Sequence, residues 1–115
     1  MSLGDQHEVV NQQDDHLASI RRESNIRSYS VIRGIMGSGV IDSLPLRVRC
    51  ECGVLICEEI IEVSLDKRRE LRRSYPRGFI VVNSHANSPI DPTVYQSDSL
   101  SVIEKLKYSD KVTDL

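Results

Sequence analysis

All three cysteines of this 115-residue chain lie within eight residues, in the segment Cys50-Glu-Cys-Gly-Val-Leu-Ile-Cys57. The count is odd, which argues against a closed set of disulfides, and a reducing compartment argues the same way. Cysteines in a Cys-x-Cys-x4-Cys pattern on a predicted turn favour a metal site that needs a fourth ligand. Gly53 suits such a turn, because a tight metal-binding turn often needs a positive φ. This segment therefore favours a small domain held together by a metal.

The fourth ligand is sought among the three histidines of the chain. His7 lies in an acidic N-terminal segment, and His16 lies at the start of a predicted helix. His85 follows a predicted strand that is expected to pack beside the cysteine hairpin. Zinc prefers four thiolate or imidazole ligands in a tetrahedron. We therefore predict one structural zinc ion, bound by Cys50, Cys52, Cys57 and His85.

Other interpretations of the cysteine cluster stay open. The thiols would be free if no metal binds, and Cys57 would form a disulfide with Cys50 or Cys52 in an oxidised protein. An iron–sulfur cluster also accepts thiolates, and spacing alone does not separate zinc from iron. A zinc hydrolase needs an open coordination position, which arises only if His85 is not a ligand. The catalytic base would then be a nearby glutamate: Glu51, Glu58 or Glu59.

Composition limits the class of protein. Fifteen basic and 17 acidic residues give a formal net charge of −2, which argues against a protein coated in positive charge for non-specific nucleic-acid binding. Aromatic residues make up 4% and tryptophan is absent, so a chain of this size needs a staple beyond its core. The sequence has no apolar run of about 18 residues, so we expect no membrane span. The polar, acidic N-terminus does not resemble a signal peptide, and we expect a cytoplasmic protein.

Patterning predicts an α+β fold, an N-terminal helix followed by β-β-α-β-β. Residues 1–14 are expected to be a disordered acidic tail, and 107–115 a polar tail. An amphipathic helix is predicted over 15–38, with its apolar stripe packed against the sheet or, alternatively, against a partner. The zinc-binding domain is predicted over 46–106. Its predicted elements are strands at 46–51, 59–63, 78–83 and 100–106, a helix at 64–74, and a long loop at 84–98.

Two surface features complete the functional hypotheses. The apolar turn Val54, Leu55 and Ile56 either packs into the core or forms an exposed knuckle that meets a partner. The stretch 64–78 carries six basic and two acidic residues, and its cations are candidate phosphate contacts: Lys67, Arg68, Arg69, Arg72, Arg73 and Arg77. We therefore expect a non-enzymatic protein-interaction or regulatory module, whose partner and oligomeric state the sequence does not give. A nucleic-acid adaptor that uses the basic helix 64–74 is the alternative.

The segment Cys50-Glu-Cys-Gly, with Cys57 four residues beyond Gly53, resembles a family of small uncharacterised bacterial proteins, mostly from actinobacteria. Ile61-Glu-Val-Ser64, the Leu71-Arg72 pair and Phe79-Ile-Val-Val-Asn-Ser-His85 extend the resemblance. It covers roughly residues 46–106 and implies a zinc site of three cysteines and one histidine. The chain departs from the family's pattern at the apolar knuckle and at Asn83-Ser84, where the family has Pro-Gly. The family supplies no activity to transfer.

Overall fold

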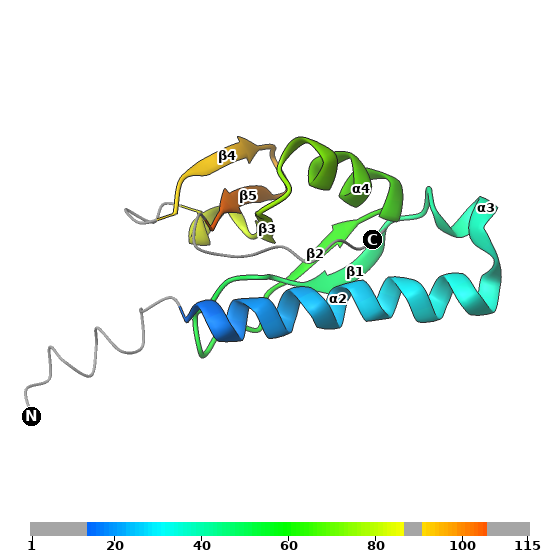
Figure 1. Cartoon of the computed structure of the whole chain (residues 1–115), viewed down its shortest axis with the longest axis horizontal. Coiled ribbons are helices and arrows are strands. Elements are labelled where there is room, and N and C mark those ends of the chain that lie inside the picture. Colours follow the sequence, from blue (N-terminus) through cyan, green and yellow to red (C-terminus); the bar gives the residue numbers. More distant parts are fainter. Residues whose placement is uncertain (1–13, 87–90, 106–115) are drawn as a thin grey trace, which may run out of the picture.

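The computed structural model describes residues 14–86 and 91–105 of the chain. Within these residues the protein is an α+β domain, in which a long N-terminal helix, two antiparallel sheets and a second helix pack together (Figure 1). This confirms the predicted fold class. The predicted tails lie outside the described residues, except for Asp14. None of the described helices is long and apolar enough to cross a membrane.

The long predicted helix is interrupted near its C-terminal end. It comprises α2, Asp15–Met36, and the short α3, Ser38–Ile41. Asp14 caps α2, because its side chain accepts a hydrogen bond from the amide of Leu17 at 3.1 Å. Gly37 separates the two helices with a φ of 80°, a left-handed conformation that glycine adopts without strain.

The face of α2 that packs against the sheets is largely polar, so the prediction of an apolar stripe facing inward is wrong. The buried residues of α2 are Ala18, Arg21, Arg22, Asn25 and Tyr29. The apolar residues that recur at helical spacing point outward instead: Ile20, Val31 and Ile35 are 47%, 60% and 78% exposed. Helical periodicity reveals that a helix has two unlike faces. It does not reveal that the polar face of the helix will be the buried one, because the groups that pair with it are carbonyl oxygens on a neighbouring loop.

The first sheet is the predicted antiparallel hairpin. It pairs β1, Leu46–Arg49, with β2, Ile60–Val63, and Val48 lies opposite Ile61. Both of these side chains are buried, whereas their strand neighbours face outward. This alternation is typical of a strand pair with one covered face. The loop that joins the two strands carries the three cysteines.

The second helix, α4, spans Leu65–Ser74 and follows β2 directly. The Ser64 side chain caps it by accepting a hydrogen bond from the amide of Lys67 at 3.1 Å. Leu65 and Leu71 are buried against the sheets. The helix therefore covers the side of the sheets opposite α2 (Figure 1).

The second sheet has three strands in the order β3-β5-β4. They are β3, Gly78–Val81, β4, Thr93–Gln96, and β5, Ser101–Glu104, and both pairings are antiparallel. Strand β4 lies within the predicted loop 84–98. The uninterrupted apolar sequence of 78–83 is typical of a central strand, but β3 lies at the edge of this sheet and β5 is central. The apolar character of β3 reflects packing against α2 and the cysteine loop.

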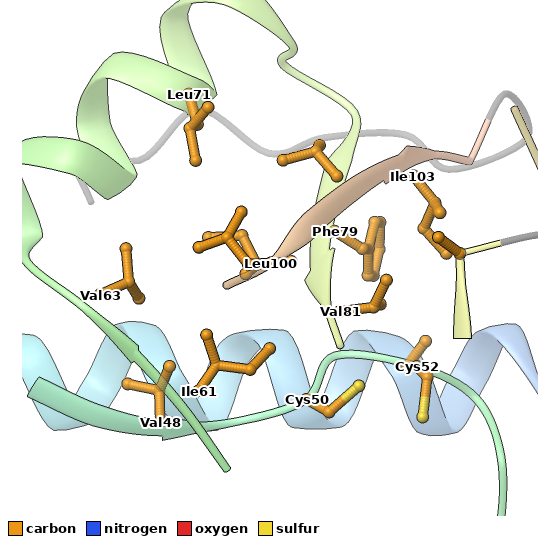
Figure 2. Packing of buried hydrophobic residues seen from close by; sticks show 14 of the residues in the cluster. Val48, Cys50, Cys52, Ile61, Val63, Leu71, Phe79, Val81, Leu100 and Ile103 are labelled. Carbon is orange, nitrogen blue, oxygen red and sulfur yellow. The ribbon is translucent and has the colours of Figure 1, made fainter. Parts of the chain in front are cut away.

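The core is aliphatic and joins the two sheets above α2. Figure 2 shows side chains of both sheets meeting there, with Cys50 and Cys52 at one edge of the cluster. The largest fully buried side chains include Tyr29, Phe79 and Leu65. A core with few aromatic rings fits the prediction that this domain needs an additional staple.

A buried lysine ties the beginning of the domain to its end. Lys105 Nζ lies 2.7 Å from Asp15 Oδ1 at the start of α2 and 2.8 Å from Asp91 Oδ2. The ammonium group also lies 5.6 Å from the centre of the Phe79 ring. Because two carboxylates and an aromatic face surround it, the charge of this 2% exposed side chain is compensated.

Candidate metal centre

The four residues predicted to bind metal gather at one point of the structure. Their ligand atoms, three cysteine Sγ atoms and one histidine ring nitrogen, all lie within 4.8 Å of one another. The three cysteines are buried free thiols, and His85 is half-buried. The donor set, Cys50, Cys52, Cys57 and His85, is one that zinc commonly uses.

The two distances from the histidine match the sulfur–nitrogen edges of a metal-centred tetrahedron. His85 Nδ1 lies 3.6 Å from Cys50 Sγ and 3.6 Å from Cys57 Sγ. Zinc–sulfur bonds of about 2.3 Å and zinc–nitrogen bonds of about 2.0 Å, set at tetrahedral angles, predict a sulfur–nitrogen edge of about 3.5 Å. The residues present therefore fit a four-coordinate ion without rearrangement of the histidine.

Two segments far apart in sequence are held together to form this site. Cys50 follows β1, and its Sγ accepts a hydrogen bond from the amide of Val82 at 3.3 Å. The amide of Glu51 donates to the carbonyl oxygen of Ile80 in β3 at 2.8 Å. These contacts join the cysteine loop to the end of β3. His85 reaches the cysteines from the 3-10 helix η1, Asn83–His85, which follows β3.

Glu51, between the first two cysteines, is the centre of a buried polar network. Its carboxylate forms an ion pair with Arg68 of α4 at 2.6 Å. It also accepts hydrogen bonds from Asn25 Nδ2 of α2 at 2.8 Å and from the amide of Ile80 at 3.1 Å. One carboxylate thus joins both helices and the second sheet to the cysteine loop. Its complete pairing explains how a fully buried glutamate is tolerated.

Arg21 of α2 holds the cysteine loop from the other side. Nη1 donates to the carbonyl oxygens of Cys52 at 2.9 Å and Val54 at 2.7 Å. Nη2 donates to those of Leu55 at 3.2 Å and Cys57 at 3.4 Å. A guanidinium group suits this role, because its donors spread in a fixed planar fork. Arg21 is therefore buried because it satisfies the backbone of the loop.

Asn25 forms hydrogen bonds with the backbone at the end of β1. Its side-chain amide donates to the carbonyl oxygen of Arg49 at 2.8 Å and accepts from the amide of Arg49 at 3.0 Å. The side chain thereby occupies the position that a neighbouring strand would take. Together with Arg21, it explains why the polar face of α2 is the buried one.

The three thiols have different proton affinities, because they contact one another. Hydrogen bonding from Cys50 lowers the pKa of Cys52 to about 5. The same hydrogen bond, together with burial, raises the pKa of Cys50, and burial raises that of Cys57. A divalent cation would replace these shared protons, since metal ligation requires thiolates.

Gly53 is required by close packing, and the prediction that it needs a positive φ is wrong. The only positive φ among the described residues belongs to Gly37. A Cβ atom on Gly53 would overlap with the backbone nitrogen and oxygen of Asp14. The amide of Asp14 donates to the carbonyl oxygen of Gly53 at 2.9 Å. The glycine therefore lets the cap of α2 approach the cysteine loop.

The apolar knuckle is divided between core and surface. Val54 is half-buried and packs against the core cluster. Leu55 and Ile56 are each 67% exposed at the tip of the loop. Val54 thus packs into the core, whereas Leu55 and Ile56 form the exposed part of the turn, and their contact with a partner stays a prediction.

The basic residues of helix 64–74 do not form one continuous exposed face. Arg68 is buried in its ion pair with Glu51, so it does not reach a phosphate at the surface. Lys67 Nζ lies 3.5 Å from Glu70 Oε1 and 5.1 Å from the centre of the Tyr95 ring. Arg69 Nη1 lies 3.7 Å from Asp42 Oδ2. Arg72 is half-buried, whereas Arg73 and Arg77 are exposed.

Sequence reasoning identified the four candidate ligands but missed the residues that support them. The position of Glu51 was an indication of its role, because an acidic residue between two clustered cysteines can pair with basic or amide groups that pack against the cysteine loop. For Arg21 and Asn25 there was no such indication in the sequence, because each resembles an ordinary solvent-exposed residue of a helix.

A scan against protein-family models and searches of curated proteins and of solved structures found no match to this chain.

Proposed function

We propose that this protein binds one structural zinc ion and acts as a small non-enzymatic interaction module. The observation that carries the proposal is the convergence of three buried cysteines and His85 within 4.8 Å. Four protein ligands of this type close the coordination sphere of zinc and leave no position for a catalytic water. A structural role is therefore favoured over hydrolysis.

The surroundings of the site support a structural role. The cysteine loop contacts α2 through Arg21, α4 through Glu51 and β3 through the Ile80 backbone. An ion at this point would fix the loop on which all three elements converge. Zinc binding in such sites is worth on the order of 10 kcal/mol, which is comparable to the whole stability of a small domain.

The interaction role rests on exposed apolar residues of the cysteine loop and of α2. Leu55 and Ile56 project from the loop, and Ile20, Val31 and Ile35 lie on the outward face of α2. Isolated apolar side chains are common on protein surfaces, and we infer a contact surface because several are exposed together, at the tip of one loop and along one face of a helix. The metal would stabilise the loop that presents part of this surface.

Cobalt substitution tests the ligand set. Cobalt(II) in a tetrahedral thiolate site absorbs visible light through d–d transitions, and sulfur-to-cobalt charge transfer adds bands in the near ultraviolet. We expect the chain to give this spectrum and to lose it when zinc is added in equal amount. His85→Ala is expected to change the spectrum and to weaken binding, whereas the matched control His16→Ala is expected to leave both unchanged. Unchanged spectra for His85→Ala, or no tetrahedral spectrum at all, would reject the proposed site.

A further inference from the structure

The outward face of α2 carries a regular seam. Leu17, Ile20, Ser24, Arg27 and Val31 follow one another at alternating steps of three and four residues, which places them along one line of a helix. The buried residues Ala18, Asn25 and Tyr29 lie on the opposite side. Figure 1 shows both sheets and α4 on one side of α2. Among the described residues, the seam therefore lies on the side away from the domain.

The knuckle lies beside the N-terminal half of α2. Buried Arg21, on the domain-facing side of this half, donates to the carbonyl oxygens of Val54 and Leu55. The exposed side chains at the tip of the loop, Leu55 and Ile56, therefore lie close to the N-terminal half of α2. The C-terminal half presents Val31 and Ile35. The seam is thus apolar at both ends and polar in its middle, at Ser24 and Arg27.

We propose that a second copy of this chain packs against the seam, with the two α2 helices antiparallel. This inference rests on the proposed function, since it names the partner of the same surface. A two-fold axis between residues 25 and 26 places Ile20 opposite Val31 of the other copy, and Ser24 opposite Arg27. Symmetry repeats each contact, as in most homodimers. The knuckle of one copy then faces the apolar C-terminal half of the other copy's α2.

Charge favours the antiparallel orientation. In this register, Glu23 lies next to Arg27 of the other copy, and the pair occurs twice across the axis. Both side chains are exposed in the single chain. A parallel pair of helices would instead place Arg27 against Arg27, and like charges that face each other across a helix interface oppose association. The charges of α2 therefore complement those of a second α2 that runs in the opposite direction.

Sedimentation velocity of the metal-loaded protein over a range of concentrations tests the dimer. We expect a reversible dimer, and we expect Val31→Arg to raise its dissociation constant at least about tenfold. Met36→Arg is the matched control, because Met36 is an exposed apolar residue on the other side of the same helix. This control is expected to leave the dimer unchanged. Circular dichroism and metal content of each variant check that it is folded.

Charge reversal tests the register. Glu23→Arg and Arg27→Glu are each expected to abolish self-association, and an equimolar mixture of the two is expected to form a heterodimer. Changes of helix stability within one chain do not produce this rescue. A wild-type monomer at about 1 mM would overturn the proposal, as would a Val31→Arg dimer of wild-type affinity or a mixture that stays monomeric. A monomer that retains one zinc rejects the dimer alone, whereas loss of metal binding rejects the proposed function.

Discussion

Arg21 donates a hydrogen bond from Nη1 to the carbonyl oxygen of Cys52 at 2.9 Å, and the same nitrogen lies 3.6 Å from Cys52 Sγ. A cation buried against a cysteine cluster compensates the negative charge that thiolate ligands bring. With zinc bound, three thiolates exceed the charge of the ion by one, and Arg21 supplies the balancing charge. The N-terminal helix and the metal centre are therefore one structural unit.

Removal of the Arg21 guanidinium is expected to destabilise the domain. Arg21→Met should lower the free energy of unfolding by about 3 kcal/mol, because several buried carbonyl oxygens lose their donor. Arg21→Lys should restore only part of this stability, because one ammonium group cannot replace a planar fork. Denaturant unfolding measures both variants, and Arg73→Met is the control for loss of an exposed arginine. Wild-type stability in Arg21→Met would show that the loop does not depend on α2.

The Glu51–Arg68 ion pair is expected to matter as a pair. Either Glu51→Gln or Arg68→Met alone should cost about 3 to 5 kcal/mol, because each leaves the other charge buried without its partner. The double variant should cost less than the sum of the two single losses. A double-mutant cycle of unfolding free energies measures this coupling. Additive losses would mean that the two charges act independently.

Gly53 and Gly39 provide a matched test of packing at the cap of α2. Gly53→Ala is expected to destabilise the protein, because the new Cβ would collide with the backbone of Asp14, which cannot rotate away. Gly39→Ala should be neutral or slightly stabilising, because no atom lies within 4 Å of its Cβ and its φ is not positive. Thermal melts of the two variants, compared with the wild type, give the answer. Equal melting temperatures would contradict the close approach of the cap and the cysteine loop.

Much of the fold could be predicted because local signals agree with the final structure. Asp14 and Ser64 are residue types that commonly cap helices, and they cap α2 and α4, while the alternating residues of β1 and β2 form the hairpin. These features depend on neighbours within a few residues. Each of them can therefore be predicted from the few residues around it.

The candidate metal ligands could be predicted for a similar reason, whereas the residues that support them could not. Three clustered cysteines limit the chemistry, and the strand before His85 brings it to the loop. The burial of Arg21 and Asn25 depends on carbonyl oxygens some 30 residues away, which no helical pattern reveals. Arg68 was assigned to a surface face for the same reason, although its partner is Glu51. Long-range polar pairing therefore decided which face of α2 is buried, and it buried Arg68 of α4 between two leucines.

Tyr29 gives the protein a specific sensitivity to alkali. Burial raises the pKa of Tyr29 to about 12, and its hydroxyl donates to the carbonyl oxygen of Val63 at 2.7 Å. The unfolded chain releases this proton near pH 10, whereas the folded chain retains it. Stability from this group is therefore complete below pH 10 and falls by about 3 kcal/mol as the pH rises from 10 to 12.

The comparison of wild type with Tyr29→Phe isolates this effect. The variant should lose the hydrogen bond at every pH, but its stability should fall less steeply between pH 10 and 12. Unfolding free energies measured across this range test the slope. Parallel curves for the two proteins would show that Tyr29 ionises as readily as an exposed tyrosine.

Metal content is the most direct test of the central claim that Cys50, Cys52, Cys57 and His85 bind one structural zinc ion. The protein should be purified without chelator, then measured by elemental mass spectrometry and by titration of reactive thiols. We predict one zinc per chain and thiols that react only after denaturation. Iron in place of zinc would contradict the identity of the metal. No metal together with three reactive thiols in the folded protein would show that the domain is held together by packing alone.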